Sequence, residues 1–294
     1  MEGKIIKIQT PKKFLLDGIF LGSLKAENII IVIHGLGGTL FSQAELAELL
    51  VDKNNSVLLF NNRGNGVLSK IKQIDKKEKG ARKKHLIGMA HEVFTDCVDD
   101  IDGAVEFVES LGNKNIFLMG HSTGCQKSIY YLSKRKNRNI KGAILLAPMS
   151  DFADTFAFTD RKIYNRAVSF AEKLIKSGKE HDLLPKKIWP YIIDAQRFLS
   201  LFTPDGVEEI FSYASGKNPK MLKKVKLPML IVLAGEDEYR DREISEIANW
   251  FEEELKEKDA ETITIKESPH NFHGFTSELS KKIKNWIKNY KANF

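Results

Sequence analysis

A serine flanked by two glycines marks the point where a short apolar run, residues 116–121, gives way to a helical pattern. Gly120, Ser122 and Gly124 have the spacing Gly-x-Ser-x-Gly. A serine at a sharp strand-to-helix turn has a strained backbone, so the positions two before and two after it must lack side-chain bulk. The helix that follows points backbone N–H groups toward the turn, where they favour negative charge. The run therefore predicts a strand, a tight turn at Ser122 and a helix.

Strand patterns alternate with helix patterns over most of the chain. Continuous apolar runs such as 28–33 and 140–146 are typical of parallel strands that are buried on both faces. Residues 91–111 and 276–291 repeat apolar side chains at steps of three and four, as helices do. The alternation predicts an α/β fold, with a mostly parallel sheet covered by helices on both faces.

Between two of these strands the alternation stops, and residues 149–221 show helical patterns and many aromatic side chains but no convincing strand. A long insertion at the carboxyl edge of a sheet is well placed to cover a site there. We therefore expect a core formed by residues 1–148 and 222–294, and a helical cap formed by residues 149–221.

The charge of the chain is basic, with a formal net charge of +7. Much of the excess is lysine in residues 69–85, where no aromatic side chains are interleaved to stack on bases. No nucleic-acid-binding motif accompanies this segment, so we interpret it as a solvated loop and expect no nucleic-acid partner.

No segment approaches the roughly 20 apolar residues that a membrane-spanning helix needs. Residues 1–6 lack the apolar core of a signal peptide, so the expected location is the cytoplasm. The helix predicted over 91–111 carries several acidic side chains, which we interpret as a solvated face and not as a metal site. These acidic residues are Asp96, Asp99, Asp100, Asp102, Glu106 and Glu109.

A serine needs a base to remove its proton, and a histidine base needs a carboxylate to orient it. In sheets of this kind the order along the chain is serine, acid, histidine, each just after a strand. Asp237 is the expected acid and Glu238 the alternative, because both follow an apolar strand. His270 is the expected base and His273 the alternative.

The negative charge that forms on a substrate carbonyl needs two backbone N–H donors. Thr123 directly follows the serine and should supply one. The other should come from the glycine-rich loop after residues 28–33, from Leu36 or alternatively from Gly37. His121 is expected only to fill space, because neighbouring strand residues point to opposite faces.

Five short motifs together resemble the α/β-hydrolases of the serine esterase and lipase type. They are HGLGG at 34–38, NNRGNG at 61–66, GHSTG at 120–124, GEDEY at 235–239 and SPHNFHGF at 268–275. GEDEY and NNRG are more similar to a subgroup of small fungal and bacterial esterases, some of which act on siderophore or hydroxycinnamoyl esters. The resemblance implies an eight-stranded, mostly parallel sheet, an inserted lid and hydrolysis without a metal or organic cofactor. It also implies a triad of Ser122, Asp237 and His270.

We therefore expect a hydrolase that cleaves small-molecule carboxylic esters. A thioesterase, a peptidase or a non-catalytic ligand-binding member of the fold are alternatives, because the fold alone does not decide the reaction. The aromatic cap suggests a mostly apolar substrate, and the lysines of the cap suggest a carboxylate somewhere in it. The acyl group, the alcohol group and the oligomeric state are left open.

Overall fold

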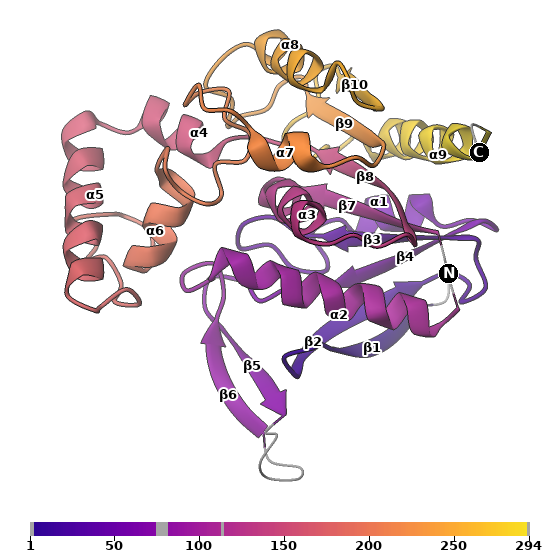
Figure 1. Ribbon diagram of the computed structural model, residues 1–294, viewed down its shortest axis with the longest axis horizontal. Coiled ribbons are helices and arrows are strands. Elements are labelled where there is room, and N and C mark those ends of the chain that lie inside the picture. The colour runs from indigo at the N-terminus through magenta and orange to yellow at the C-terminus, as the bar shows by residue number, and fades with distance from the viewer. Residues whose placement is uncertain (1–2, 75–81, 113–114, 293–294) are drawn as a thin grey trace.

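A ten-stranded sheet runs through the centre of the protein (Figure 1). The structure, a computed structural model, describes residues 3–74, 82–112 and 115–292. Six parallel strands lie side by side in the order β10 (Ala260–Ile265), β9 (Met229–Ala234), β8 (Ile140–Leu146), β7 (Ile116–His121), β3 (Asn28–Ile33) and β4 (Asn55–Phe60). Antiparallel pairing then adds β2 (Phe14–Leu21), β1 (Gly3–Gln9), β5 (Ser69–Ile74) and β6 (Arg82–Ile87). The α/β fold expected from the alternation is confirmed.

The central strands are buried on both faces, which explains their continuous apolar sequences. Every residue of β3 is buried. Because successive strand side chains point to opposite faces, Ile30 and Val32 join one core cluster while Ile29 and Ile31 join another. The sheet therefore needs a layer of helices on each side.

Two sets of helices supply these layers. Apolar side chains of α1 (Ala44–Leu50) and α9 (Thr276–Ala292) pack in the cluster on one face. On the other face lie α2 (Cys97–Ser110), preceded by the short 3₁₀ helix η1 (Phe94–Asp96), then α3 (Thr123–Lys134) and α8 (Ile244–Leu255). Among the described residues no helix is both long and apolar enough to cross a membrane.

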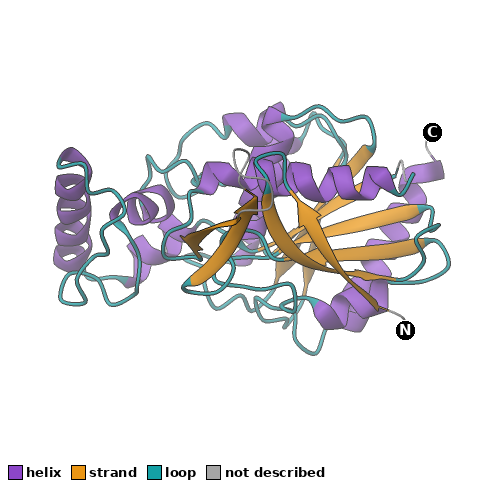
Figure 2. Cartoon of the chain, turned by 90° about the horizontal axis from the view of Figure 1, so that it is seen from below, coloured by secondary structure: helices purple, strands orange, loops and turns teal. Residues whose placement is uncertain are grey.

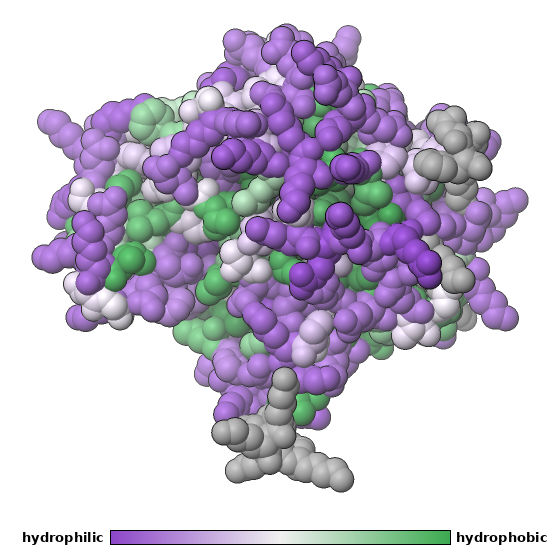
Figure 3. All heavy atoms as spheres, viewed as in Figure 1, coloured by the Kyte–Doolittle hydropathy of each residue, from purple (hydrophilic) through white to green (hydrophobic). Residues whose placement is uncertain are grey.

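Four helices lie in the stretch between β8 and β9. They are α4 (Asp151–Phe158), α5 (Arg161–Lys176), α6 (Ala195–Phe202) and α7 (Lys220–Lys224). Figures 1 and 2 place α4, α5 and α6 at one end of the molecule, beyond the carboxyl ends of the parallel strands. A small core of their own, including the buried Trp189 and Phe198, stabilises this group. On the face shown in Figure 3, apolar residues gather over α5 and α6.

The lysine-rich segment 69–85 is not a loop throughout, and this expectation is corrected. Its described parts form the antiparallel hairpin of β5 and β6, which raises the strand count to ten. Ile71 and Ile87 are buried at the base of the hairpin, while the lysines beside Ile71 are exposed. The alternation of buried and exposed side chains that is typical of a strand is thus present in β5, but the many lysines obscure it in the sequence. Residues 75–81 lie outside the described residues.

The helix expected over 91–111 begins only at Cys97, and its acidic face is not wholly solvated. Asp99 and Asp100 are buried, and both bind the side chain of Arg63. Nε of Arg63 lies 2.7 Å from Asp100 Oδ1, and Nη2 lies 3.0 Å from Asp99 Oδ2. The interpretation as a solvated face is wrong for these two residues, because a charged partner from the loop after β4 stabilises them in the interior.

Candidate active site

The turn at Ser122 has the strained backbone that its glycines predict. Ser122 lies between β7 and α3 with φ 55° and ψ −129°, a backbone conformation that residues other than glycine rarely adopt. A Cβ on Gly120 would lie 2.3 Å from the carbonyl oxygen of Gly124, and a Cβ on Gly124 would lie 2.1 Å from that of Ile33. Only glycine fits at either position. The Ser122 N–H donates to Leu146 O at 2.9 Å, which fixes the turn to the neighbouring strand.

Asp237 and His270 come together beyond the ends of β9 and β10. Oδ2 of Asp237 lies 2.7 Å from Nδ1 of His270, and the side chain of Asp237 is 0% exposed. The other oxygen, Oδ1, accepts the Tyr239 N–H at 3.0 Å. The parallel order of β9 and β10 explains the meeting, because both chains leave the sheet at the same edge. Nδ1 of His270 is thus oriented by a buried carboxylate, so Nε2 is the ring nitrogen that can accept a further proton.

The two alternatives have different places. Glu238 contacts the backbone of His270, where Oε2 accepts the N–H at 2.9 Å, and not the ring. His273 is exposed and its N–H donates to Asn271 Oδ1. The structure therefore brings Asp237, and not Glu238, to the imidazole of His270.

His121 does more than fill space, and this expectation is corrected. Its Nε2 lies 2.9 Å from the carbonyl oxygen of His270, and the two rings are 5.0 Å apart. Burial, followed by the nearby His270, lowers the pKa of His121 to about 4. A carbonyl oxygen can only accept, so the neutral ring donates from Nε2 and anchors the loop of His270. Nothing in the sequence signals this contact except the position of His121 beside the serine.

The glycine-rich loop after β3 packs directly on the serine. A Cβ on Gly35 would lie 2.8 Å from the Cβ of Ser122, so this close approach requires glycine. Gly37 has a φ of +61°. Among the described residues no hydrogen-bond acceptor takes up the backbone N–H of Leu36 or of Thr123. Both donors therefore remain available for a group bound beside Ser122.

A buried polar network that the sequence did not predict supports this loop. The ring of His34 accepts the Asn62 N–H at 3.2 Å. Lys127 is 0% exposed, and its Nζ lies 3.2 Å from Asn62 Oδ1 and 2.6 Å from Glu92 Oε1. Arg197 of α6 forms an ion pair with Glu92 at 2.9 Å. The network connects the loop after β3 to the helical insertion.

One cavity of about 910 Å³ brings these groups together. Ser122, His121 and His270 line it, as do Gly35 and Leu36 of the glycine-rich loop. Aromatic side chains from the insertion line it too, namely Phe158, Trp189, Tyr191 and Phe202. A second cavity, of about 840 Å³, lies among α4, α5 and α6 and is lined by none of the residues around Ser122.

Three carboxyl side chains line the first cavity, together with its histidines. They are Asp151, Asp154 and Glu238, and none of the described lining residues is a lysine or arginine. Burial raises the pKa of Asp151 to about 8 and that of Asp154 to about 6. The lysines of the insertion thus do not face this cavity, and the carboxylate that they suggested in the substrate has no basic partner here.

Comparison with known proteins gives a family and a fold. Residues 87–290 match the family described as "Protein of unknown function (DUF1749)". None of the curated proteins matches the sequence. The structure is similar to the siderophore hydrolase EstB from Aspergillus fumigatus, with a TM-score of 0.66 and 17% identity over 98% of both chains.

Two further solved structures agree. Est1E from Butyrivibrio proteoclasticus, which was solved with ferulic acid bound, has a TM-score of 0.65 and 16% identity over 98% of this chain and 99% of its own. The esterase Pf2001 from Pyrococcus furiosus has a TM-score of 0.61 and 16% identity over 98% and 91%. The chain therefore belongs to the DUF1749 family and has the α/β-hydrolase fold.

Proposed function

We propose that this protein is a serine hydrolase that cleaves carboxylic esters through an acyl-enzyme on Ser122. One observation supports the proposal above all others: a strained serine and a carboxylate-held histidine line the same cavity. In the proposed organisation, residues 149–221 form a lid over a core of residues 1–148 and 222–294. The lid supplies the aromatic wall of the cavity.

In the proposed reaction, Oγ of Ser122 attacks the ester carbonyl while Nε2 of His270 accepts its proton. The carboxylate of Asp237 stabilises the imidazolium that forms and keeps Nδ1 protonated. His270 then protonates the departing alcohol, which leaves an acyl group on Ser122. A water molecule, deprotonated by His270, releases the acid and restores the serine.

The negative oxygen of each tetrahedral intermediate would bind the backbone N–H groups of Leu36 and Thr123. These donors are uncommitted to other acceptors among the described residues. Gly37 is the alternative donor on the same loop. Removal of one such donor typically costs about 3–4 kcal/mol in transition-state stabilisation.

The lining of the cavity supports a neutral or cationic substrate of aromatic or aliphatic character. Aromatic rings from the lid offer apolar contact, and Asp154 and Glu238 offer negative charge. The structural neighbours include a siderophore hydrolase and a protein with bound ferulic acid. An anionic substrate would meet like charge with no basic partner among the lining residues.

A fluorophosphonate probe and p-nitrophenyl butyrate test the proposal together. We expect one probe molecule to attach to Ser122, located by peptide mass spectrometry, and Ser122→Ala to lower kcat by on the order of 10⁶-fold. Ser177→Ala is the matched control, because Ser177 is exposed at the end of α5.

Three results would contradict this function. A folded protein with neither labelling nor turnover on neutral, cationic or anionic esters would favour a ligand-binding member of the fold. Turnover that survives Ser122→Ala would exclude the acyl-enzyme. Faster turnover of a thioester or an amide than of the matched ester would assign the same machinery to a thioesterase or a peptidase.

A further inference from the structure

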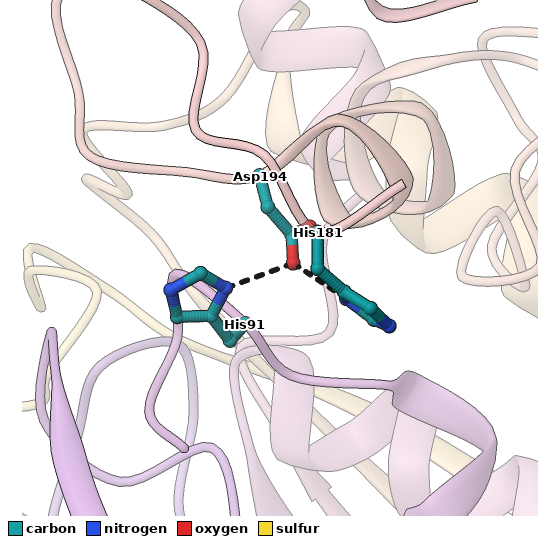
Figure 4. A group of neighbouring side chains, drawn as sticks. All are labelled: His91, His181 and Asp194. Carbon is teal, nitrogen blue, oxygen red and sulfur yellow. Dashed lines mark hydrogen bonds and ion pairs between the residues drawn. The ribbon is translucent and has the colours of Figure 1, made fainter. Parts of the chain in front are cut away.

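Three side chains outside the cavity converge on one point (Figure 4). His91 comes from the connection between β6 and η1, His181 from the connection between α5 and α6, and Asp194 directly precedes α6. Nδ1 of His91 and Nδ1 of His181 each lie 3.0 Å from the same oxygen, Oδ2 of Asp194. We infer that these three residues bind a divalent transition-metal ion of the zinc type.

The distances agree with such an ion. Zinc bonds of about 2.0–2.2 Å in a tetrahedral arrangement place neighbouring ligand atoms about 3.3–3.5 Å apart. The two nitrogen-to-oxygen distances are 3.0 Å, and the three candidate ligand atoms all lie within 4.8 Å of one another. Small side-chain movements therefore suffice to hold the ion. Two imidazoles and a carboxylate are a donor set that zinc accepts, with a fourth position left for solvent.

Burial of Asp194 adds a reason for a cation. Its side chain is 0% exposed, and a buried carboxylate needs a compensating charge. Among the described residues its only ion-pair partners are His91 and His181. A divalent ion between the three groups would neutralise the carboxylate without protonating either ring.

The surroundings also fix the orientation of the carboxylate. Oδ1 of Asp194 accepts hydrogen bonds from the backbone N–H of Arg197 at 2.8 Å and from Nε2 of Gln196 at 3.1 Å. These bonds turn Oδ2 toward the histidines. The side chain of His181 is 57% exposed, so an ion can reach the site from solvent. The site thus has oriented ligands and a route of access.

Such an ion would join the insertion to the core. His91 belongs to the segment before α2, whereas His181 and Asp194 belong to the insertion. The Asp194 N–H also donates to Ala90 O at 2.9 Å, so the two segments already meet there. Ile193, next to Asp194, lines the cavity of Ser122, whereas none of the three ligands does. The ion would stabilise the position of the insertion and take no part in the chemistry at Ser122.

Zinc titration of chelator-treated protein by calorimetry tests the site, with Co²⁺ in place of Zn²⁺ to show the ligand field in the visible spectrum. We expect one equivalent bound with a Kd in the micromolar range or below. His181→Ala should weaken binding at least 100-fold, and bound zinc should raise the Tm of the wild-type protein. His273→Ala, which removes an exposed histidine elsewhere, is the matched control for binding.

Because Asp194 caps α6, Asp194→Asn could unfold the insertion, whereas the largely exposed His181 can be replaced with little structural cost. Binding that is unchanged in His181→Ala, or that needs millimolar zinc, would overturn the site. A Tm that depends on pH but not on zinc would assign the cluster to an ion pair with protonated histidine, and would also overturn it.

Discussion

Replacement of Asp237 by asparagine should remove most of the activity while the fold survives. The carboxylate is 0% exposed and lies 2.7 Å from Nδ1 of His270, so it accepts a hydrogen bond from that nitrogen at a position shielded from solvent. An asparagine would present an amide N–H to the ring, which favours the tautomer with the proton on Nε2. That tautomer cannot accept the proton of Ser122. We expect kcat to fall by about 10⁴-fold, which corresponds to about 5.4 kcal/mol.

Glu238→Gln is the matched control for a neutral substrate, because Glu238 is the neighbouring carboxylate and accepts a hydrogen bond from the backbone N–H of His270, not from its ring. A glutamine oxygen can still accept that bond, so we expect a loss of less than about tenfold. Turnover of p-nitrophenyl butyrate by both variants, with thermal unfolding to show that each is folded, provides the comparison. Equal losses in the two variants, or a larger loss in Glu238→Gln, would refute the assignment of Asp237 as the orienting acid.

Three further changes test other parts of the structure. Gly124→Ala places a Cβ 2.1 Å from the carbonyl oxygen of Ile33. Thermal unfolding should therefore show that the free energy of unfolding falls by at least about 2 kcal/mol. A stable variant that reacts fully with a fluorophosphonate would contradict the turn geometry. Lys127→Met removes one of the two cationic partners of the buried Glu92, the one at 2.6 Å, and leaves Arg197 at 2.9 Å, so it should cost about 1.5–3 kcal/mol in urea unfolding; a cost under 1 kcal/mol would show that the pair is not needed. Burial raises the pKa of Asp154 to about 6, so this carboxyl is ionised above that pH and neutral below it. An anionic substrate should therefore be repelled less at low pH. We expect the kcat/KM for a succinate monoester, divided by that for the matched neutral ester, to rise as the pH falls from 7.5 to 5.5. Asp154→Asn should remove most of that rise, and a ratio independent of pH in the wild-type protein would disprove the effect.

Local sequence patterns determined the sheet, its helical layers and the turn at Ser122. A strand that is buried on both faces must be continuously apolar, and a turn that brings Gly124 against Ile33 O excludes every side chain. Such requirements act on neighbouring residues, so the sequence alone can predict them. The positions of Asp237 and His270 could also be predicted, because each follows a strand pattern and parallel strands end at the same edge of the sheet.

The tertiary structure alone decided which charged and polar groups meet. Asp237 and Glu238 are adjacent in sequence, and only the path of the chain beyond β9 turns one toward the ring of His270 and the other toward its backbone. Likewise, the burial of Asp100 depends on Arg63, which lies 37 positions away. The periodicity of apolar side chains indicates which face of a helix or strand is buried, but it does not identify a partner residue from a distant segment. The interior can hold a charge only where such a partner arrives, and the complete fold determines where that happens.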